Sequence, residues 1–168
     1  MTAVRNGADI VVHTAPQSGL WDGELVTEMK EAGVAIIPTL KLWQHELRHD
    51  RTSIRKRFAG LAVEQLRAWS SAGGTVLFGT DVGYMDDYDP TDEYVLMAAA
   101  GMGFPQVLAS LTTAPAQRFQ ASSQLGRIAP GLKADLVVLG ADPATDIRAF
   151  ASVRQTFRDG KPIYSATR

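Results

Sequence analysis

The chain has 168 residues, of which 45% are hydrophobic and 21% are charged, and its formal net charge at pH 7 is −1. These proportions are typical of a folded globular domain, and they exclude collagen, coiled coils and intrinsic disorder. The 17 basic residues are balanced by 18 acidic ones, so we expect neither nucleic acid nor a membrane surface as a partner. Cysteine is absent, which excludes disulfides, thiolate metal sites and a cysteine nucleophile.

The apolar stretches are too short to cross a bilayer, which takes roughly 20 residues. The N-terminus lacks a basic segment followed by an apolar one, so no signal peptide is expected. We therefore expect a soluble chain with a buried core, whose localisation stays open with the cytoplasm as the default.

The first third of the chain alternates strand and helix patterns. A β-branched run over residues 8–13 predicts a buried strand that ends at His13. Helical spacing of apolar residues predicts a helix over residues 22–32, which Gly33 would terminate. Residues 34–39 then predict a second strand.

The same alternation continues after a polar, basic stretch. Apolar residues at three-to-four spacing predict an amphipathic helix over residues 53–71. A third buried strand is expected over residues 75–79, followed directly by Thr80 and Asp81. Apolar strands that alternate with helices predict the α/β class, with a parallel sheet covered on both faces.

The second half of the chain changes in character. Helices are expected first, at residues 89–100, 104–111 and 114–120. Strand patterns follow at residues 136–139 and 153–164, interrupted by glycine and proline turn signals. This change predicts a boundary near residue 121, with one domain over residues 1–120 and a small β domain over residues 121–168.

Two of the three predicted strands end in side chains that can bind a metal, His13 and Asp81. Ligands of parallel α/β folds bind beyond the C-terminal ends of the strands. The carboxylate of Asp81 can ligate a cation and also accept a proton from water. The alternatives are a turn or cap role for Asp81 and a hydrogen-bonded core role for His13.

A rival metal site is the sequence HELRH, which matches the H-E-x-x-H zinc motif. In a zinc protease, His45 and His49 would ligate the metal and Glu46 would act as the general base. The motif requires an amphipathic helix, whereas the strongly basic residues that follow are typical of a solvated face. The zinc protease is therefore the weaker of the two hypotheses.

Acidic residues cluster shortly after Asp81, at Asp86, Asp87, Asp89, Asp92 and Glu93. They lack the glycine-centred loop of an EF-hand, which argues against a calcium site. We interpret them as favourable charges at the N-terminus of the next helix.

Several motifs together resemble the C-terminal part of the metal-dependent amidohydrolase superfamily, especially its imidazolonepropionase-like and prolidase-like branches. GADIVVH at residues 7–13 resembles the sixth barrel strand, and TVLFGTDVG at residues 75–83 resembles the eighth. Residues 34–40 resemble the seventh strand. The most specific match is LGRIAPGLKADLVVL at residues 125–139, which is similar to the return into a small β-sandwich domain of that family.

The resemblance implies part of a TIM-like (β/α)8 barrel, strands six to eight, with one or two divalent metal ions, zinc foremost, at its C-terminal mouth. It implies hydrolysis of a carbon–nitrogen bond in a small-molecule amide, cyclic amide or dipeptide. His13 would bind metal or polarise the substrate carbonyl. Asp81 would bind metal and act as the general base, while His45 would at most line the substrate pocket.

The paired histidines of strand one, the lysine of strand four and the histidine of strand five in that family have no counterparts here. A barrel removes its free edges only when all its strands are present. We therefore expect a fragment, half of a split enzyme, or a subunit that associates with the missing half or with itself. The alternative is a non-catalytic structural or interaction module of the same fold.

Overall fold

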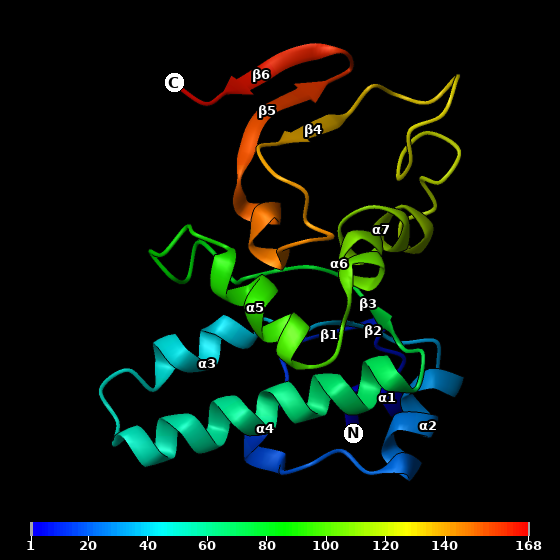
Figure 1. The fold of residues 1–168 in the computed structure, drawn as a ribbon. Helices are drawn as coiled ribbons and strands as arrows, with labels where there is room; N and C mark the ends of the chain where they lie inside the picture. Colours follow the sequence, from blue (N-terminus) through cyan, green and yellow to red (C-terminus); the bar gives the residue numbers. More distant parts are fainter. Residues whose placement is uncertain (1, 168) are drawn as a thin grey trace.

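The computed structural model describes residues 2–167, which form two three-stranded sheets, one parallel and one antiparallel (Figure 1). Helices of the first part of the chain surround the parallel sheet, and the antiparallel sheet lies at the opposite end of the molecule from α4. The elements are, in order, α1 (Thr2–Arg5), β1 (Ile10–Val12), η1 (Pro16–Ser18), α2 (Gly23–Glu31), β2 (Ala35–Ile37), α3 (Leu40–Glu46), α4 (Thr52–Ser71), β3 (Thr75–Val76), α5 (Thr91–Ala99), α6 (Phe104–Leu111), α7 (Thr113–Arg118), β4 (Leu136–Leu139), η2 (Ile147–Ala151), β5 (Val153–Arg158) and β6 (Lys161–Ser165).

The first sheet has the order β1-β2-β3, and all its neighbours are parallel. This arrangement confirms the predicted α/β class with a parallel sheet. The central strand β2 is the most deeply buried of the three, because neighbouring elements cover Ala35 and Ile36 completely. The third strand is shorter than predicted. Leu77 still donates its N–H to the carbonyl of Ile36, but Phe78 donates to Ser110 of α6, so the chain leaves the ladder there.

The long helix α4 supplies much of the core, and its buried face follows the predicted helical spacing. Leu66 and Trp69 are fully buried, together with Met29 of α2 and Met97 of α5. The indole Nε1 of Trp69 donates a hydrogen bond of 3.0 Å to the carbonyl of Thr75. The core therefore ties α4 to the start of β3.

Helix α3 was not expected, because the sequence predicted no helix or strand between residues 39 and 53. Its first residues, Leu40, Lys41 and Leu42, are buried. Their conformation is held from outside, because the carboxylate of Glu93 accepts the N–H groups of Leu40 (2.9 Å) and Lys41 (2.8 Å). Glu93 is in the first turn of α5, as predicted, but it has no exposed surface and also binds the start of α3, which the sequence did not indicate.

The second sheet, β4-β5-β6, is antiparallel throughout. The strand pattern predicted over residues 153–164 resolves into β5 and β6, joined at Asp159-Gly160. Phe150 of η2 packs against Tyr94 and Phe104, with ring centroids 5.4 and 5.9 Å apart. The domain boundary near residue 121 stays a prediction.

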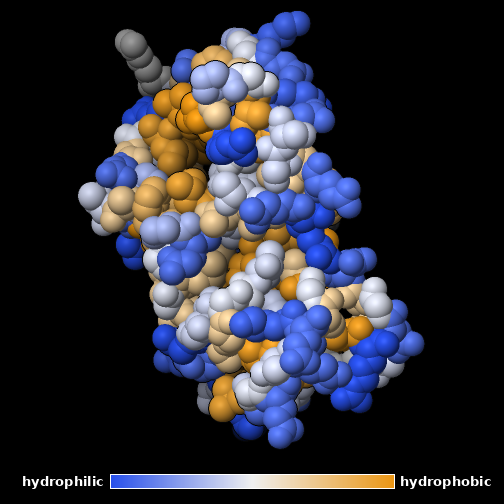
Figure 2. All heavy atoms as spheres, turned by 90° about the vertical axis from the view of Figure 1, so that its right-hand side faces the viewer, coloured by the Kyte–Doolittle hydropathy of each residue, from blue (hydrophilic) through white to orange (hydrophobic). Residues whose placement is uncertain are grey.

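Apolar side chains remain exposed on the antiparallel sheet. Figure 2 shows them gathered in the upper part of the molecule, at the height of β4 to β6 in Figure 1. Ile163 is 63% exposed, and Val137, Val138 and Tyr164 are also exposed. Separately, none of the helices within residues 2–167 has the length and apolar character needed to cross a bilayer.

Candidate metal centre

Three residues that follow the parallel strands adopt left-handed backbone conformations. The φ angle is 71° at His13 after β1, 46° at Thr39 after β2 and 63° at Asp81 after β3. This conformation costs a residue with a Cβ roughly 1–2 kcal/mol, and a β-branched residue such as threonine adopts it rarely. Backbone strain of this kind is concentrated at functional sites, where the surrounding structure maintains it. The backbone conformation thus indicates a candidate site at the C-terminal ends of the parallel strands.

The imidazole of His13 is held by the neighbouring strand. Its backbone N–H donates to the carbonyl of Ile37 (2.8 Å), which extends the β1–β2 ladder by one residue. Its Nδ1 lies 2.8 Å from the hydroxyl oxygen of Thr39. Its Nε2 makes no hydrogen bond to the described residues. One ring nitrogen is therefore anchored, and the other is available to a ligand.

Asp81 lies five residues beyond β3, at the start of a tight turn. Its carbonyl accepts the N–H groups of Tyr84 and Met85, both at 3.2 Å. Within residues 2–167, its carboxylate accepts no hydrogen bond, and the side chain is only partly buried. The turn thus fixes the backbone and leaves the carboxylate free to bind a ligand.

The chemistry of these two donors fits a divalent cation. An imidazole nitrogen and a carboxylate oxygen suit zinc, and they also suit manganese, iron or cobalt. Their number does not complete a site, because a catalytic zinc centre generally takes three protein ligands. No group of three or more histidines and acids in the described part of the chain could hold a metal ion.

The HELRH segment does not form the helix that a zinc protease requires. Helix α3 ends at Glu46, and residues 47–49 form a turn, so His45 and His49 do not share a helix face. The carboxylate of Glu46 accepts a hydrogen bond of 2.8 Å from the hydroxyl of Tyr84, and the ring of His45 meets Tyr84 edge-on. These contacts join the end of α3 to the turn after Asp81. The zinc-protease hypothesis is therefore wrong.

Sequence reasoning missed the polar residues that support His13. The sequence predicts Thr39 as the last residue of a strand, whereas β2 ends at Ile37 and Thr39 precedes α3. Thr14 is buried, and its hydroxyl accepts a hydrogen bond of 2.8 Å from the indole of Trp43. Gln65 of α4 holds the loop after His13, because its amide bonds both the N–H and the carbonyl of Ala15 at 2.8 Å. The one signal for these residues is a polar side chain within an apolar pattern, which does not identify its partner.

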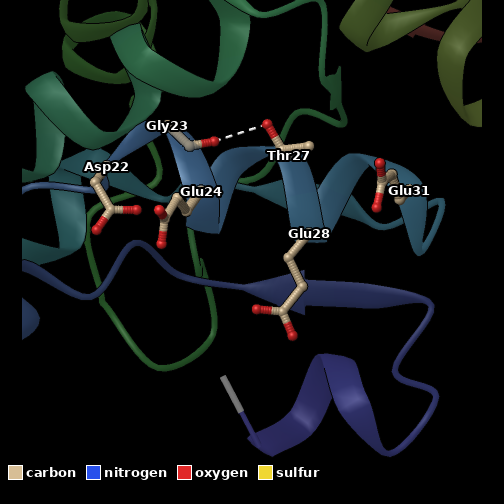
Figure 3. A pocket seen from close by; sticks show the side chains of 6 residues that line it. All are labelled: Asp22, Gly23, Glu24, Thr27, Glu28 and Glu31. Atoms are coloured by element: carbon tan, nitrogen blue, oxygen red, sulfur yellow. Dashed lines mark hydrogen bonds between the residues drawn. The ribbon is translucent and has the colours of Figure 1, made fainter.

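A surface depression lies elsewhere, on α2, and most of its lining residues are acidic (Figure 3). Asp22 is committed to capping the helix through the N–H of Leu25 (2.8 Å), and Glu28 pairs with Arg5. The depression contains neither His13 nor Asp81. Two of its acidic residues thus serve a helix cap and an ion pair, and the depression is separate from the candidate metal centre.

The structure thus combines a parallel α/β sheet with a histidine and an aspartate that follow its two outer strands. Residues 5–164 match the model of the amidohydrolase family, and the chain belongs to that family. This confirms the resemblance drawn from the sequence motifs. No curated protein matches the chain.

Solved structures share the fold across nearly the whole chain. A Xaa-Pro dipeptidase with methionine bound in its active site is 24% identical, with a TM-score of 0.81 over 98% of this chain and 41% of its own. A prolidase in complex with N-methylphosphonate-L-proline is 27% identical, with a TM-score of 0.79 over 98% and 42%. An ochratoxinase from A. niger is 21% identical, with a TM-score of 0.79 over 98% and 39%. The chain thus spans about two fifths of these relatives.

Proposed function

We propose that the chain supplies the sixth, seventh and eighth strands of an amidohydrolase barrel, as β1, β2 and β3, followed by part of a small β domain. In the completed enzyme it hydrolyses a carbon–nitrogen bond of a small-molecule amide, cyclic amide or dipeptide. The observation that carries this proposal is the placement of His13 and Asp81 after the two outer strands of a parallel triple in a chain of this family. Division of the chain into residues 1–120 and 121–168 is part of the same proposal.

The outer strands support a partner in the assembly. Both β1 and β3 have one neighbour in the described sheet, so each leaves one edge of its backbone unpaired. Val12 of β1 is 47% exposed, which is unusual for a strand of a covered parallel sheet. Such edges pair readily with other strands. The proposed partner is the missing barrel half or, failing that, a second copy of this chain.

The proposed mechanism assigns separate tasks to the two side chains. His13 through Nε2 and Asp81 through its carboxylate would hold a divalent cation, which when bound supplies Lewis-acid polarisation and makes water more acidic. Asp81 would accept a proton from the attacking water while the oxygen of that water adds to the carbonyl carbon of the substrate. It would then return this proton to the amine nitrogen as the carbon–nitrogen bond breaks. In a single-metal enzyme, His13 would instead polarise the substrate carbonyl.

The experiment is performed on the barrel completed with the missing strands, in one chain or as a partner. Asp81→Asn keeps the shape of the side chain and removes the base, so kcat should fall by roughly 10²- to 10⁴-fold with KM altered far less. His13→Ala should lower turnover together with metal content, whereas the control His45→Ala should change either little. Near-normal turnover of Asp81→Asn with metal bound would refute the mechanism.

The alternative function is a non-catalytic module of the same fold. It is favoured by the absence of a third metal ligand from residues 2–167. The coding DNA upstream of Met1 separates the two proposals. In-frame barrel sequence containing His-x-His supports the enzyme, and its absence supports the module.

A further inference from the structure

Thr39 combines burial, strain and a specific contact beside the candidate metal centre. The residue is 1% exposed, and its φ angle of 46° is in the left-handed region that threonine rarely adopts. Its hydroxyl has two partners. It lies 2.8 Å from the carbonyl oxygen of Pro38 and 2.8 Å from Nδ1 of His13. The hydroxyl of Thr39 is therefore fixed between the carbonyl of Pro38 and the imidazole of His13.

The proton of this hydroxyl can be assigned by elimination. A hydroxyl carries one proton, and the carbonyl of Pro38 can only accept a hydrogen bond. Both contacts are hydrogen bonds at once only when Thr39 donates its proton to Pro38 and its hydroxyl oxygen accepts the second hydrogen bond. The donor in that second bond must be the imidazole, which requires a proton on Nδ1 of His13. In the neutral ring, Nε2 then carries the lone pair.

The surrounding structure keeps Thr39 in this position from both sides. On its C-terminal side, the buried carboxylate of Glu93 binds the N–H groups of Leu40 and Lys41. On its N-terminal side, the carbonyl of Pro38 also accepts the N–H of Thr14 at 3.1 Å, which ties β2 to the residue after His13. The left-handed backbone of Thr39 is thus fixed independently of its own hydroxyl.

We propose that Thr39 is a positioning residue whose hydroxyl holds His13 as the Nδ1-protonated tautomer and directs the lone pair of Nε2 toward the candidate metal centre. The tautomer follows from contacts within this chain, whereas its use for metal binding rests on the proposed function. A histidine that binds metal through one nitrogen commonly donates the other N–H to a fixed acceptor. Thr39 supplies that acceptor here.

The test reads the tautomer directly by NMR. The chain has three histidines, so the variant His45→Gln/His49→Gln leaves His13 as the one imidazole. Long-range ¹H–¹⁵N correlation spectra of this ¹⁵N-labelled variant, recorded at a pH where the ring is neutral, distinguish a protonated Nδ1 from a protonated Nε2. We expect the Nδ1-protonated form to predominate. A predominance of the Nε2-protonated form would overturn the proposal without any further variant.

Two substitutions in the same background assign the effect to the hydroxyl. Thr39→Ser keeps the hydroxyl and should keep the tautomer, whereas Thr39→Val keeps the shape and should yield a mixture. An unchanged tautomer in a folded Thr39→Val chain would refute the role of Thr39. If Thr39→Val does not fold, the Thr39→Ser spectrum decides, because loss of the Nδ1-protonated form there also refutes the role.

Metal titration of the completed barrel separates this inference from the proposed function. Zinc binding that requires His13 and weakens in Thr39→Val but not in Thr39→Ser supports both. The expected tautomer without zinc binding leaves Thr39 as the group that orients His13 and refutes the metal centre. Zinc binding equal in Thr39→Val and the parent refutes the positioning role.

Discussion

Glu93 makes the stability of this protein depend on pH in an unusual direction. Its carboxylate is fully buried and binds the first N–H groups of α3. Burial raises the pKa of Glu93 from 4.5 to about 7, although these two hydrogen bonds and the nearby ammonium of Lys41 lower it. The folded chain therefore retains a proton on Glu93 at pH values where the unfolded chain has released it.

The sign and the size of the effect follow from this difference. Between pH 4.5 and about pH 7, the folded state binds more protons than the unfolded state, so the free energy of unfolding falls as pH rises. A pKa change of this size corresponds to roughly 3 kcal/mol in total. Above about pH 7 both states are deprotonated at this group, and the contribution no longer varies.

Glu93→Gln is the matched substitution, because it keeps the side-chain shape and cannot titrate. Urea unfolding, followed by tryptophan fluorescence at several pH values, gives the free energy of unfolding of both chains. As pH rises from 4.5 to about 7, the free energy of unfolding of the wild type should fall by roughly 3 kcal/mol relative to that of the variant. Parallel pH profiles of the two chains would show that the Glu93 carboxyl is not perturbed.

Two further outcomes are expected of the chain. A Cβ at Gly74 would lie 2.1 Å from Cε2 of Trp69, so Gly74→Ala should lower the stability by about 1–3 kcal/mol, measured by urea unfolding. The control Gly60→Ala, in open space within α4, should raise it by about 0.5–1 kcal/mol, and equal effects would contradict the close approach at Gly74. The chain alone should form oligomers through its unpaired strands, which sedimentation velocity would detect. It should also bind a hydrophobic dye at its exposed apolar residues, which dye fluorescence would detect. A compact monomer that binds no dye would argue against the truncated barrel.

Features that depend on local patterning could be predicted from the amino-acid sequence. Alternating apolar strands and amphipathic helices indicated the parallel α/β class, and the turn signals near residue 159 indicated strands in the C-terminal part. These features follow from periodicity within a few residues, because a strand or helix buries its own apolar face wherever it packs. The family motifs likewise led to the amidohydrolase family, and they placed His13 and Asp81 after strands.

Contacts between polar groups of distant segments, in contrast, are set by how the helices and strands pack. Glu93 is in the first turn of α5, where an acidic residue is expected whether it faces water or another helix. Its real partners are more than 50 residues earlier in the chain. The same holds for Thr39 and His13, which are 26 residues apart, and for the HELRH segment, which leaves the helix after Glu46. Hydrogen bonds between distant segments leave no periodic signal, because they depend on how the elements pack rather than on the order of residues within each element.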